Sequence, residues 1–201
     1  MTAMSPCAAS ILWNARVADL YVPLSDGQVS LEILAEHHRE ALRAACAEDQ
    51  EIWQIYPFSY EGPHFDGAFD RMLHGNPGRR CYAVFDQKAL IGMTAWIEHG
   101  APKHSIEIGN SYIVPRLRGT GFNTRLKKLM LDHAFACGRM RVAFKIDEIN
   151  PRSQAAVLKL GCTKEGVMRA ERITWTGRVR HTGLFSILAD EWRAQMANDD
   201  G

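Results

Sequence analysis

Arg116-Leu117-Arg118-Gly119-Thr120-Gly121-Phe122-Asn123 decides the fold, because it joins an apolar, strand-like run to an amphipathic helix. The run spans 106–114, and the helix is expected at 122–137, closed by Gly138. Glycines let the backbone approach a ligand, and the first N–H groups of a helix have no partner within it. The helix dipole adds partial positive charge at the same place. The stretch therefore predicts a site for phosphate or pyrophosphate, and with it a phosphorylated cofactor.

Two familiar phosphate-binding loops do not fit this stretch. A P-loop needs Gly-x-x-x-x-Gly-Lys-Ser/Thr, and the sequence contains no such run. A dinucleotide fingerprint needs a third glycine after Gly119 and Gly121, where Thr124 stands. The cofactor class is therefore decided by other motifs.

Length and composition favour one domain. The 201 residues, 46% of them hydrophobic, are enough for a single buried core. We expect an irregular N-terminal extension over residues 1–26 and one domain over residues 27–197. The net charge of +1 gives no global field for nucleic acid or an anionic membrane. No apolar run approaches the ~20 residues of a membrane span, and the N-terminus lacks a signal-peptide pattern.

The five cysteines are scattered and contain no Cys-x-x-Cys pair. We interpret them as reduced thiols in a reducing compartment, which predicts a cytoplasmic protein. Cys137 falls on the apolar side of its helix, where packing is the expected role.

Hydrophobic periodicity predicts a mixed α/β order of elements. Strands are expected at 29–33, 80–85, 90–98, 104–114, 141–146, 166–176 and 180–189. Helices are expected at 36–47, 50–55, 68–73, 122–137 and 151–160, with a short one opening at Glu191-Trp192. On the helix at 122–137, the apolar stripe is Phe122, Leu126, Leu129, Met130 and Ala134, and the residues expected to face away are Arg125, Lys127, Lys128 and Asp132.

Two motifs in the right order resemble the GNAT superfamily of acetyl-CoA-dependent N-acetyltransferases. The first is Arg/Gln-x-x-Gly-x-Gly/Ala, occupied by Arg116, Gly119 and Gly121. The second is Asn-x-x-Ser, Leu-x-x-Gly-Phe and Glu-Gly, represented by 150–153, 158–162 and 165–166, with Cys162 in place of the phenylalanine. Ile106-Glu107-Ile108-Gly109 and the ending 185–192 are similar to the ribosomal-protein alanine acetyltransferase branch (RimJ/RimL type). The resemblance implies a GNAT fold, with a mostly antiparallel sheet splayed at a bulge and flanked by helices.

The resemblance also implies which residues hold acetyl-CoA. Backbone groups of Ile113 and Val114 would pair with the pantetheine arm, and Asn150 would hydrogen-bond to it. Arg116 or Arg118 would meet a CoA phosphate as a charge-assisted pair. Backbone N–H groups of the loop would bind the pyrophosphate, with two side-chain donors in the first helical turn: Arg118, Gly119, Thr120, Gly121 and Phe122 for the backbone, and Asn123 and Thr124 for the side chains.

The chemistry needs a base and a proton donor. An amine acceptor is mostly protonated at pH 7, so a carboxylate near the site has to take its proton. Glu107 matches the family glutamate and lies six residues before Ile113, which on a regular strand places both on one face; the alternative is a solvated strand glutamate. Many family members protonate the leaving thiolate with a tyrosine, and Val157 stands at its position. The RimJ/RimL-type branch has a serine in the Asn-x-x-Ser motif instead, so the resemblance implies Ser153 as the donor, with Ser111 and Tyr112 as alternatives.

Three further groups of residues have open roles. The aromatic side chains at 53–65 are either a small satellite core or a stacking surface for the acceptor, and we prefer the core. His37-His38 is interpreted as helix surface rather than a metal site. A basic set could attract an acidic substrate, but a solvated face is the preferred interpretation: Arg169, Arg172, Arg178 and Arg180.

The sequence thus predicts an enzyme that moves acetyl from acetyl-CoA directly to a primary amine through a ternary complex. The acceptor is either a protein N-terminus or a small-molecule amine, since function is grafted on folds. No metal, nucleic acid or membrane is expected, and a homodimer is open. The alternative is a non-catalytic acyl-CoA-binding module, which the absent tyrosine at Val157 keeps open.

Overall fold

The computed structural model describes residues 19–98 and 103–199. Most of the expected N-terminal extension, and Cys7 with it, lies outside these ranges. The strands are β1 (Leu24–Ser25), β2 (Val29–Ile33), β3 (Arg79–Asp86), β4 (Ala89–Ile97), β5 (Ser105–Ile113), β6 (Arg141–Asp147), β7 (Thr163–Ile173) and β8 (Val179–Leu188). The α-helices are α1 (Arg39–Ala47), α2 (Phe65–His74), α3 (Phe122–Ala136), α4 (Pro151–Lys159) and α5 (Ala189–Asp199). Four short 3-10 turns are η1 (Glu36–His38), η2 (Glu51–Ile55), η3 (Gly62–His64) and η4 (Pro115–Leu117).

The strands form one sheet in the order β1-β2-β3-β4-β5-β6-β8-β7. Only β5 and β6 pair in parallel, and they do so over three residue pairs, from Ser105↔Arg141 to Glu107↔Ala143. Beyond Glu107 the two strands have no further ladder pairs, so β5 presents backbone groups without a strand partner toward β6. The expected mixed fold with a mostly antiparallel sheet, splayed and flanked by helices, is confirmed.

A bulge in β5 marks the point where the sheet opens. The β4–β5 ladder pairs Ala95 with Gly109 but Met93 with Tyr112, so two residues of β5, Asn110 and Ser111, stand opposite the single residue Thr94 of β4. Asn110 takes a left-handed conformation with φ of 50°, which asparagine tolerates better than most residues. Beside the bulge, a Cβ on Gly92 would lie 2.0 Å from the carbonyl oxygen of Tyr112, so only glycine fits there.

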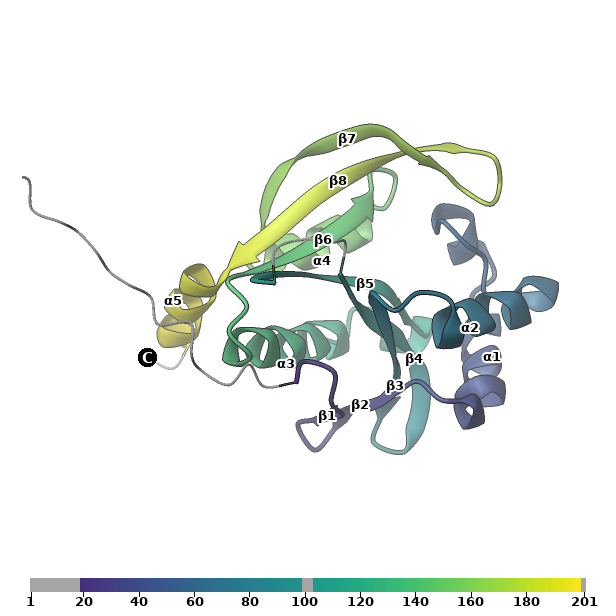
Figure 1. Cartoon of the computed structure of the whole chain (residues 1–201), viewed down its shortest axis with the longest axis horizontal. Coiled ribbons are helices and arrows are strands. Elements are labelled where there is room, and N and C mark those ends of the chain that lie inside the picture. Colours follow the sequence, from purple (N-terminus) through teal and green to yellow (C-terminus); the bar gives the residue numbers. More distant parts are fainter. Residues whose placement is uncertain (1–18, 99–102, 200–201) are drawn as a thin grey trace, which may run out of the picture.

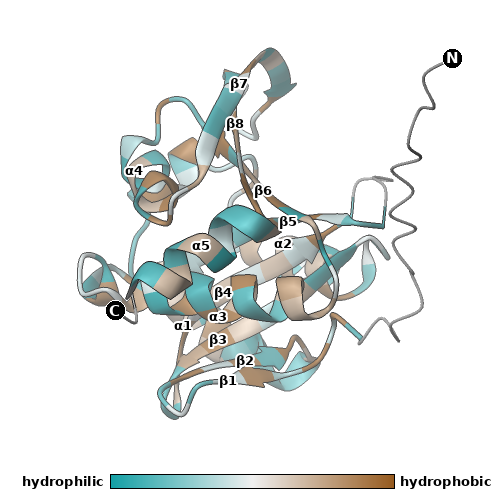
Figure 2. Ribbon diagram, turned by 90° about the vertical axis from the view of Figure 1, so that its left-hand side faces the viewer, coloured by the Kyte–Doolittle hydropathy of each residue, from teal (hydrophilic) through white to brown (hydrophobic). Residues whose placement is uncertain are grey.

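The helices cover both faces of the sheet (Figure 1). α1 and α2 lie on one face, where Tyr112 donates a hydrogen bond to the carbonyl of Ala45. α3 lies on the other face, where Met130 packs against Thr94. Hydrophobic residues concentrate in the central strands and alternate with polar ones on the helices (Figure 2). No helix in the described ranges is both long and apolar enough to cross a membrane.

The element order follows the expectation, with four differences. β7 begins and ends three residues before the strand expected at 166–176. α2 begins at Phe65, three residues before the expected start, because Phe65 and Phe69 are both fully buried on one helix face. The expected helices at 36–47 and 50–55 begin or consist of 3-10 turns. Leu24–Ser25 forms a short edge strand against β2, and Leu24 joins the hydrophobic core.

Candidate active site

A cavity of about 280 Å³ opens where β5 and β6 separate. Its lining comes from the bulged half of β5, from β6, from the loop before α3, from the first turns of α3 and α4, and from η2, β3, β7 and β8. Of the residues expected at the site, the structure brings these into the lining: Glu107, Ser111, Tyr112, Ile113, Arg118, Gly119, Asn123, Asn150 and Ser153. It does not bring these into it: Val114, Arg116, Thr120, Gly121, Phe122 and Thr124.

The loop before α3 has the geometry of an anion site. Gly119 and Gly121 have φ of 78° and 89°, a region that favours glycine. The first backbone bond of α3 runs from Arg125 N–H to Gly121 O, so the preceding N–H groups lie outside the helical ladder. One of these, on Phe122, meets the hydroxyl of Thr120 at 3.4 Å. The remaining donors point out of the helix N-terminus, as an oxyanion requires.

The two arginines of this loop are held by acidic residues at the end of α1. Arg116 donates two hydrogen bonds to Glu48, at 2.6 and 2.7 Å, and is half exposed outside the cavity. Arg118 pairs with Asp49 and donates from Nε to the carbonyl of Ile113 at 3.1 Å. Arg118 therefore anchors the loop to the strand end, in addition to facing the cavity.

Glu107 lies in the cavity wall and is 8% exposed. Its carboxylate oxygen is 3.4 Å from Nζ of Lys145 on β6. A Cβ at position 109 would lie 3.0 Å from the other carboxylate oxygen of Glu107. Because Gly109 has no side chain, the carboxylate is not crowded there. The even-spacing argument that put Glu107 and Ile113 on one face is wrong. The ladder pairs them with Ile97 and Gly92, five residues apart on β4, because the bulge adds a residue between them.

The bulge thus gives the cavity two sides. Glu107 is on the face of α1 and α2, whereas Ser111 is on the face of α3, where it meets Thr94 at 2.8 Å. Groups of opposite faces can reach one ligand only through the opening between β5 and β6. A ligand that enters from the α3 side would present its end to Glu107.

Lys127 is a cavity residue that the sequence pattern missed. It was expected to face away, yet it is 4% exposed and donates to Ser111 Oγ at 2.6 Å and to Thr94 Oγ1 at 3.3 Å. Burial lowers the pKa of its ammonium to about 7. The sequence feature that could have indicated its burial is Leu131, four residues further on the same helix face. Leu131 is fully buried, and the expected apolar stripe did not include it.

Ser153 and Asn150 are organised by the start of α4. Asn150 caps the helix, its Oδ1 accepting from the N–H of Ser153 at 3.0 Å. Pro151 occupies the first helical position, as is typical of a helix start. Within the described ranges, no hydrogen bond to the Ser153 hydroxyl is found. Val157 is buried one turn further on, where the family tyrosine would stand.

The aromatic segment before α2 is mostly core, which confirms the preferred interpretation. Trp53, Tyr60 and Phe65 are buried, and the Trp53 ring packs 4.8 Å from Tyr112. Tyr56 alone of this group lines the cavity, with its hydroxyl bonded to the carbonyl of Ser111.

The interpretation of the basic set as a solvated face is wrong for two of its members. Arg180 is 6% exposed, and both Arg180 and Arg172 line the cavity. Arg178 pairs with the buried Asp147 at 2.5 Å. Arg169 is exposed, as expected.

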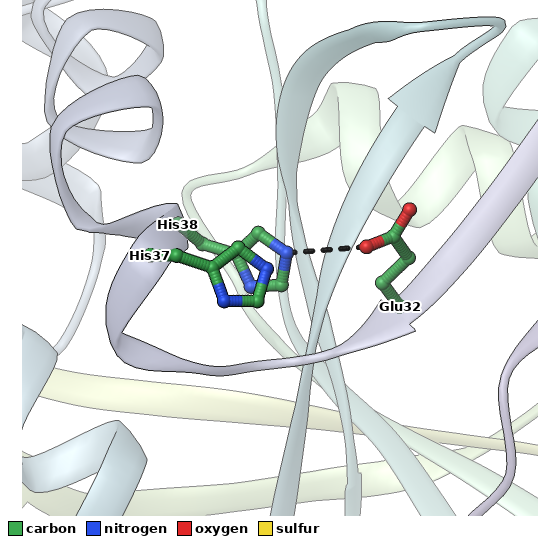
Figure 3. A group of neighbouring side chains, drawn as sticks. All are labelled: Glu32, His37 and His38. Atoms are coloured by element: carbon green, nitrogen blue, oxygen red, sulfur yellow. Dashed lines mark hydrogen bonds and ion pairs between the residues drawn. The ribbon is translucent and has the colours of Figure 1, made fainter.

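His37 is exposed, as expected, but His38 differs from the expectation of a surface residue. His38 is 3% exposed, and its Nδ1 accepts from the N–H of Ala35 at 3.1 Å. Its Nε2 then carries the proton in the neutral ring and points to Glu32 at 3.3 Å (Figure 3). Glu32, His37 and His38 are near enough to share an ion, but these hydrogen bonds account for the arrangement of His38.

Comparison with known proteins identifies the family of this chain. The model of the acetyltransferase (GNAT) domain matches residues 28–163, more than half of the chain. The chain belongs to the GNAT acetyltransferase family. It is an N-acetyltransferase, of a family that uses acetyl-CoA.

Solved structures agree with this GNAT assignment. A protein from T. thermophilus assigned as an acetyltransferase is 30% identical, with a TM-score of 0.77, over 88% of this chain and 94% of its own. A GCN5-related N-acetyltransferase from Brucella melitensis is 25% identical, with a TM-score of 0.76, over 87% and 81%. Spermidine N-acetyltransferase from Vibrio cholerae, in complex with CoA and spermine, shares the fold at 23% identity and a TM-score of 0.66, over 83% and 98%. No curated protein matches the chain in sequence.

Proposed function

We propose that this GNAT enzyme transfers acetyl from acetyl-CoA directly to a primary amine, in a ternary complex without a covalent enzyme intermediate. One observation carries the proposal: a single cavity contains both the phosphate-loop side of α3 and the carboxylate of Glu107, on opposite faces of an opened sheet. Cofactor and acceptor can therefore approach each other from the two sides.

The residues proposed to hold acetyl-CoA differ in how many of their hydrogen-bonding groups are still available for a ligand. Val114 N–H already donates to Ile91 O on β4. Successive N–H groups of a strand point to opposite sides, so the N–H of Ile113 points toward β6. Ile113 is therefore the better partner for the pantetheine arm. Asn150 uses Oδ1 for its helix cap and keeps its NH₂ group for a ligand. The pyrophosphate is assigned to the N–H groups around Gly119 and Gly121, with help from Asn123 and Thr124. Of the two arginines, Arg118 is the one positioned for a phosphate.

Glu107 is proposed as the general base. Acetyl-CoA supplies a thioester whose C–S bond breaks as the amine nitrogen forms the new C–N bond. Glu107, directly or through water, takes the proton that the amine loses. Backbone N–H groups near Ile113 are proposed to polarise the carbonyl oxygen.

Ser153 is proposed to donate a hydrogen bond to the departing thiolate. It lines the cavity at the start of α4, where its hydroxyl is not used by the helix cap. A hydroxyl of high pKa is a weak acid, so its proton has to be replaced from water as the sulfur receives one. Val157 offers no such group at the position of the family tyrosine.

The branch and the acceptor are the finer part of the proposal. The resemblance to the RimJ/RimL type suggests a protein N-terminal amine, and a small-molecule amine is equally compatible with the motifs. The cavity is at the small end of the usual range for ligand sites, which favours a compact acceptor.

Replacing Glu107 by Gln tests the base. Loss of a general base lowers kcat by about 10²-fold or more, whereas the Kd for acetyl-CoA should remain within about two-fold. The rate of Glu107→Gln should then rise with pH as the free amine accumulates, which reduces the difference from wild type in alkaline solution. Steady-state kinetics between pH 6 and 10 and calorimetric titration with acetyl-CoA measure both effects.

The matched control is Glu40→Gln, an exposed glutamate on α1 that does not line the cavity. Calorimetry with NADH and ATP controls for unspecific phosphate binding. Equal rates for Glu107→Gln and wild type at every pH would remove Glu107 from the role of base. Absence of acetyl-CoA binding to wild type would overturn the cofactor proposal.

A further inference from the structure

The cavity has a strong excess of positive charge. Among the described residues, seven basic side chains line it, against the two acidic residues Glu107 and Asp147: Arg79, Arg118, Lys127, Lys145, Arg152, Arg172 and Arg180. Arg118 and Lys127 belong to the side of α3, where the anionic cofactor is proposed to bind. The remaining cations need another explanation.

Four of them share one face of the sheet with Glu107. Arg79 pairs with Ile97, and Ile97 pairs with Glu107, so Arg79 and Glu107 are two strands apart in one row. On the other side, Glu107 pairs with Ala143, and Lys145 follows two residues later on β6. Residues that pair across strands or alternate by two along one strand point to one face. Lys145 is therefore next to the carboxylate, and Arg79 lies on the same face two strands away.

The β7–β8 hairpin adds the other two. Lys145 pairs with Leu184 on β8, and Arg180 lies four residues before it, on the same face. Arg172 of β7 pairs with Arg180 and is close enough to Glu107 for their charges to interact. Side chains from four different strands thus line the cavity that contains this carboxylate.

The acidic residues nearby balance these charges only in part. Arg172 is held by Glu171, with hydrogen bonds of 2.5 and 2.6 Å. Arg180 is 3.8 Å from Asp147, but Asp147 already pairs with Arg178 at 2.5 Å. Burial with few counter-charges is unfavourable for a cation, and it lowers the pKa of Arg180.

Arg79 gives a second, independent sign of a missing partner. Its Nε is buried and has no hydrogen-bond partner in the described part of the chain. Buried donors are satisfied in nearly all native proteins, so Arg79 lines the cavity with its hydrogen-bonding capacity only partly used. The atom it requires is an acceptor.

We infer that the acceptor amine carries an anionic group, a carboxylate or a phosphate, close to its amino group. The anion binds among Arg79, Arg172 and Arg180, and the amine then lies at Glu107. A polyamine has only positive charges and would be repelled by the same side chains. This inference rests on the proposed acetyl transfer and specifies its substrate class.

Matched pairs of amines test the inference directly. L-Phenylalanine and 2-phenylethylamine differ by a carboxylate, phosphoethanolamine and ethanolamine differ by a phosphate, and spermidine is the polycation. Acetylation is measured by release of CoA thiol, and binding by calorimetric titration of the CoA-loaded protein. We expect at least one anionic member to exceed its uncharged counterpart by tenfold or more in kcat/KM, and the preferred pair identifies the anion.

Arg172→Gln should lower that preference by about tenfold to a hundredfold through KM, the usual effect of losing a charged hydrogen bond. Arg172→Lys should restore part of it. Arg169→Gln is the control, because Arg169 is exposed on the same strand and does not line the cavity. Arg79→Gln is the second variant if Arg172→Gln fails to fold.

Each outcome decides between the two proposals. Preferred acetylation of spermidine, of an uncharged amine or of an uncharged peptide N-terminus would overturn the inference and leave acetyl transfer intact. If no amine is acetylated, the proposed function fails. Binding then decides the inference: tighter binding of the anionic members supports it, and equal or absent binding overturns it.

Discussion

Single residues decide which groups this enzyme can use, and Lys127 is the clearest case. A lysine on an amphipathic helix is normally expected in solvent, and Arg125 and Asp132 on α3 are exposed, as that expectation requires. The deciding fact is tertiary: Ser111 and Thr94 provide two hydroxyl oxygens under the helix. Periodicity along one helix cannot reveal partners that two other strands supply.

Lys127 should make stability depend on pH. Its pKa is about 7 in the folded state and near 10.5 when unfolded, so between these values the unfolded chain binds the extra proton. Stability therefore rises with pH from 7 to 10.5, by up to about 1.4 kcal/mol per pH unit. Lys127→Met lacks this dependence, so the free energy of unfolding of wild type relative to the variant should increase over that window. Urea denaturation at pH 7, 8, 9 and 10 measures it.

Lys159→Met serves as the control, since Lys159 is an exposed lysine at the end of α4. Its curve should run parallel to that of wild type. Parallel curves for Lys127→Met as well would mean that Lys127 is charged and well solvated in the folded protein.

At the scale of elements, the sequence predicts the regular parts of the molecule and misses the irregular one. The helix at 122–136 and the strands around it are readable because their apolar residues repeat with the period of each element. The bulge at Asn110 and Ser111 breaks that period by one residue. A pattern of side chains does not show such a shift, because the register with β4 determines it. The even-spacing argument for Glu107 failed for that reason.

Gly92→Ala tests how tightly the bulge is fixed. The added Cβ would lie 2.0 Å from Tyr112 O and 3.1 Å from the Cα of Ile113, so the β5 backbone has to move. Such overpacking typically costs about 1–3 kcal/mol, and here it also shifts the strand end proposed to bind the pantetheine arm. We expect a lower midpoint of urea denaturation together with a weaker Kd for acetyl-CoA.

Gly166→Ala is the matched control on β7, where a Cβ would meet nothing within 4 Å. It should change neither quantity appreciably. A Gly92→Ala protein with wild-type stability and affinity would show that the bulge can adjust without affecting the cavity.

At the scale of the whole molecule, the site is assembled from segments far apart in the chain. The motifs of the phosphate loop and of α4 are local in the sequence. The sequence could therefore predict four residues that do line the cavity: Gly119, Asn123, Asn150 and Ser153. Arg79 precedes Arg172 by more than ninety residues, and only the strand order brings both to Glu107. No pattern within one segment contains that information.

The β7–β8 hairpin closes the cavity across the molecule. It arches over the sheet, and its turn approaches the segment before α2 (Figure 1). Trp175, at that turn, donates from its backbone to Pro57 O at 3.2 Å and from Nε1 to Trp53 O at 2.8 Å. Its ring also packs 5.1 Å from His64. Arg172 and Arg180 lie on the two strands that this contact holds in place.

Trp175→Ala should therefore affect the acceptor more than the cofactor. Loss of one hydrogen bond and one ring contact destabilises the fold by only about 1–2 kcal/mol, but it releases the hairpin turn from the segment at 53–64. We expect the KM for the acceptor to rise about threefold to tenfold, with the Kd for acetyl-CoA within twofold of wild type, measured by kinetics and calorimetry. Ile173→Ala, an exposed hairpin residue, is the control. An unchanged acceptor KM in Trp175→Ala would show that the position of Arg172 and Arg180 is set by the sheet alone, whereas equal losses for acceptor and acetyl-CoA would point to a general loosening of the fold.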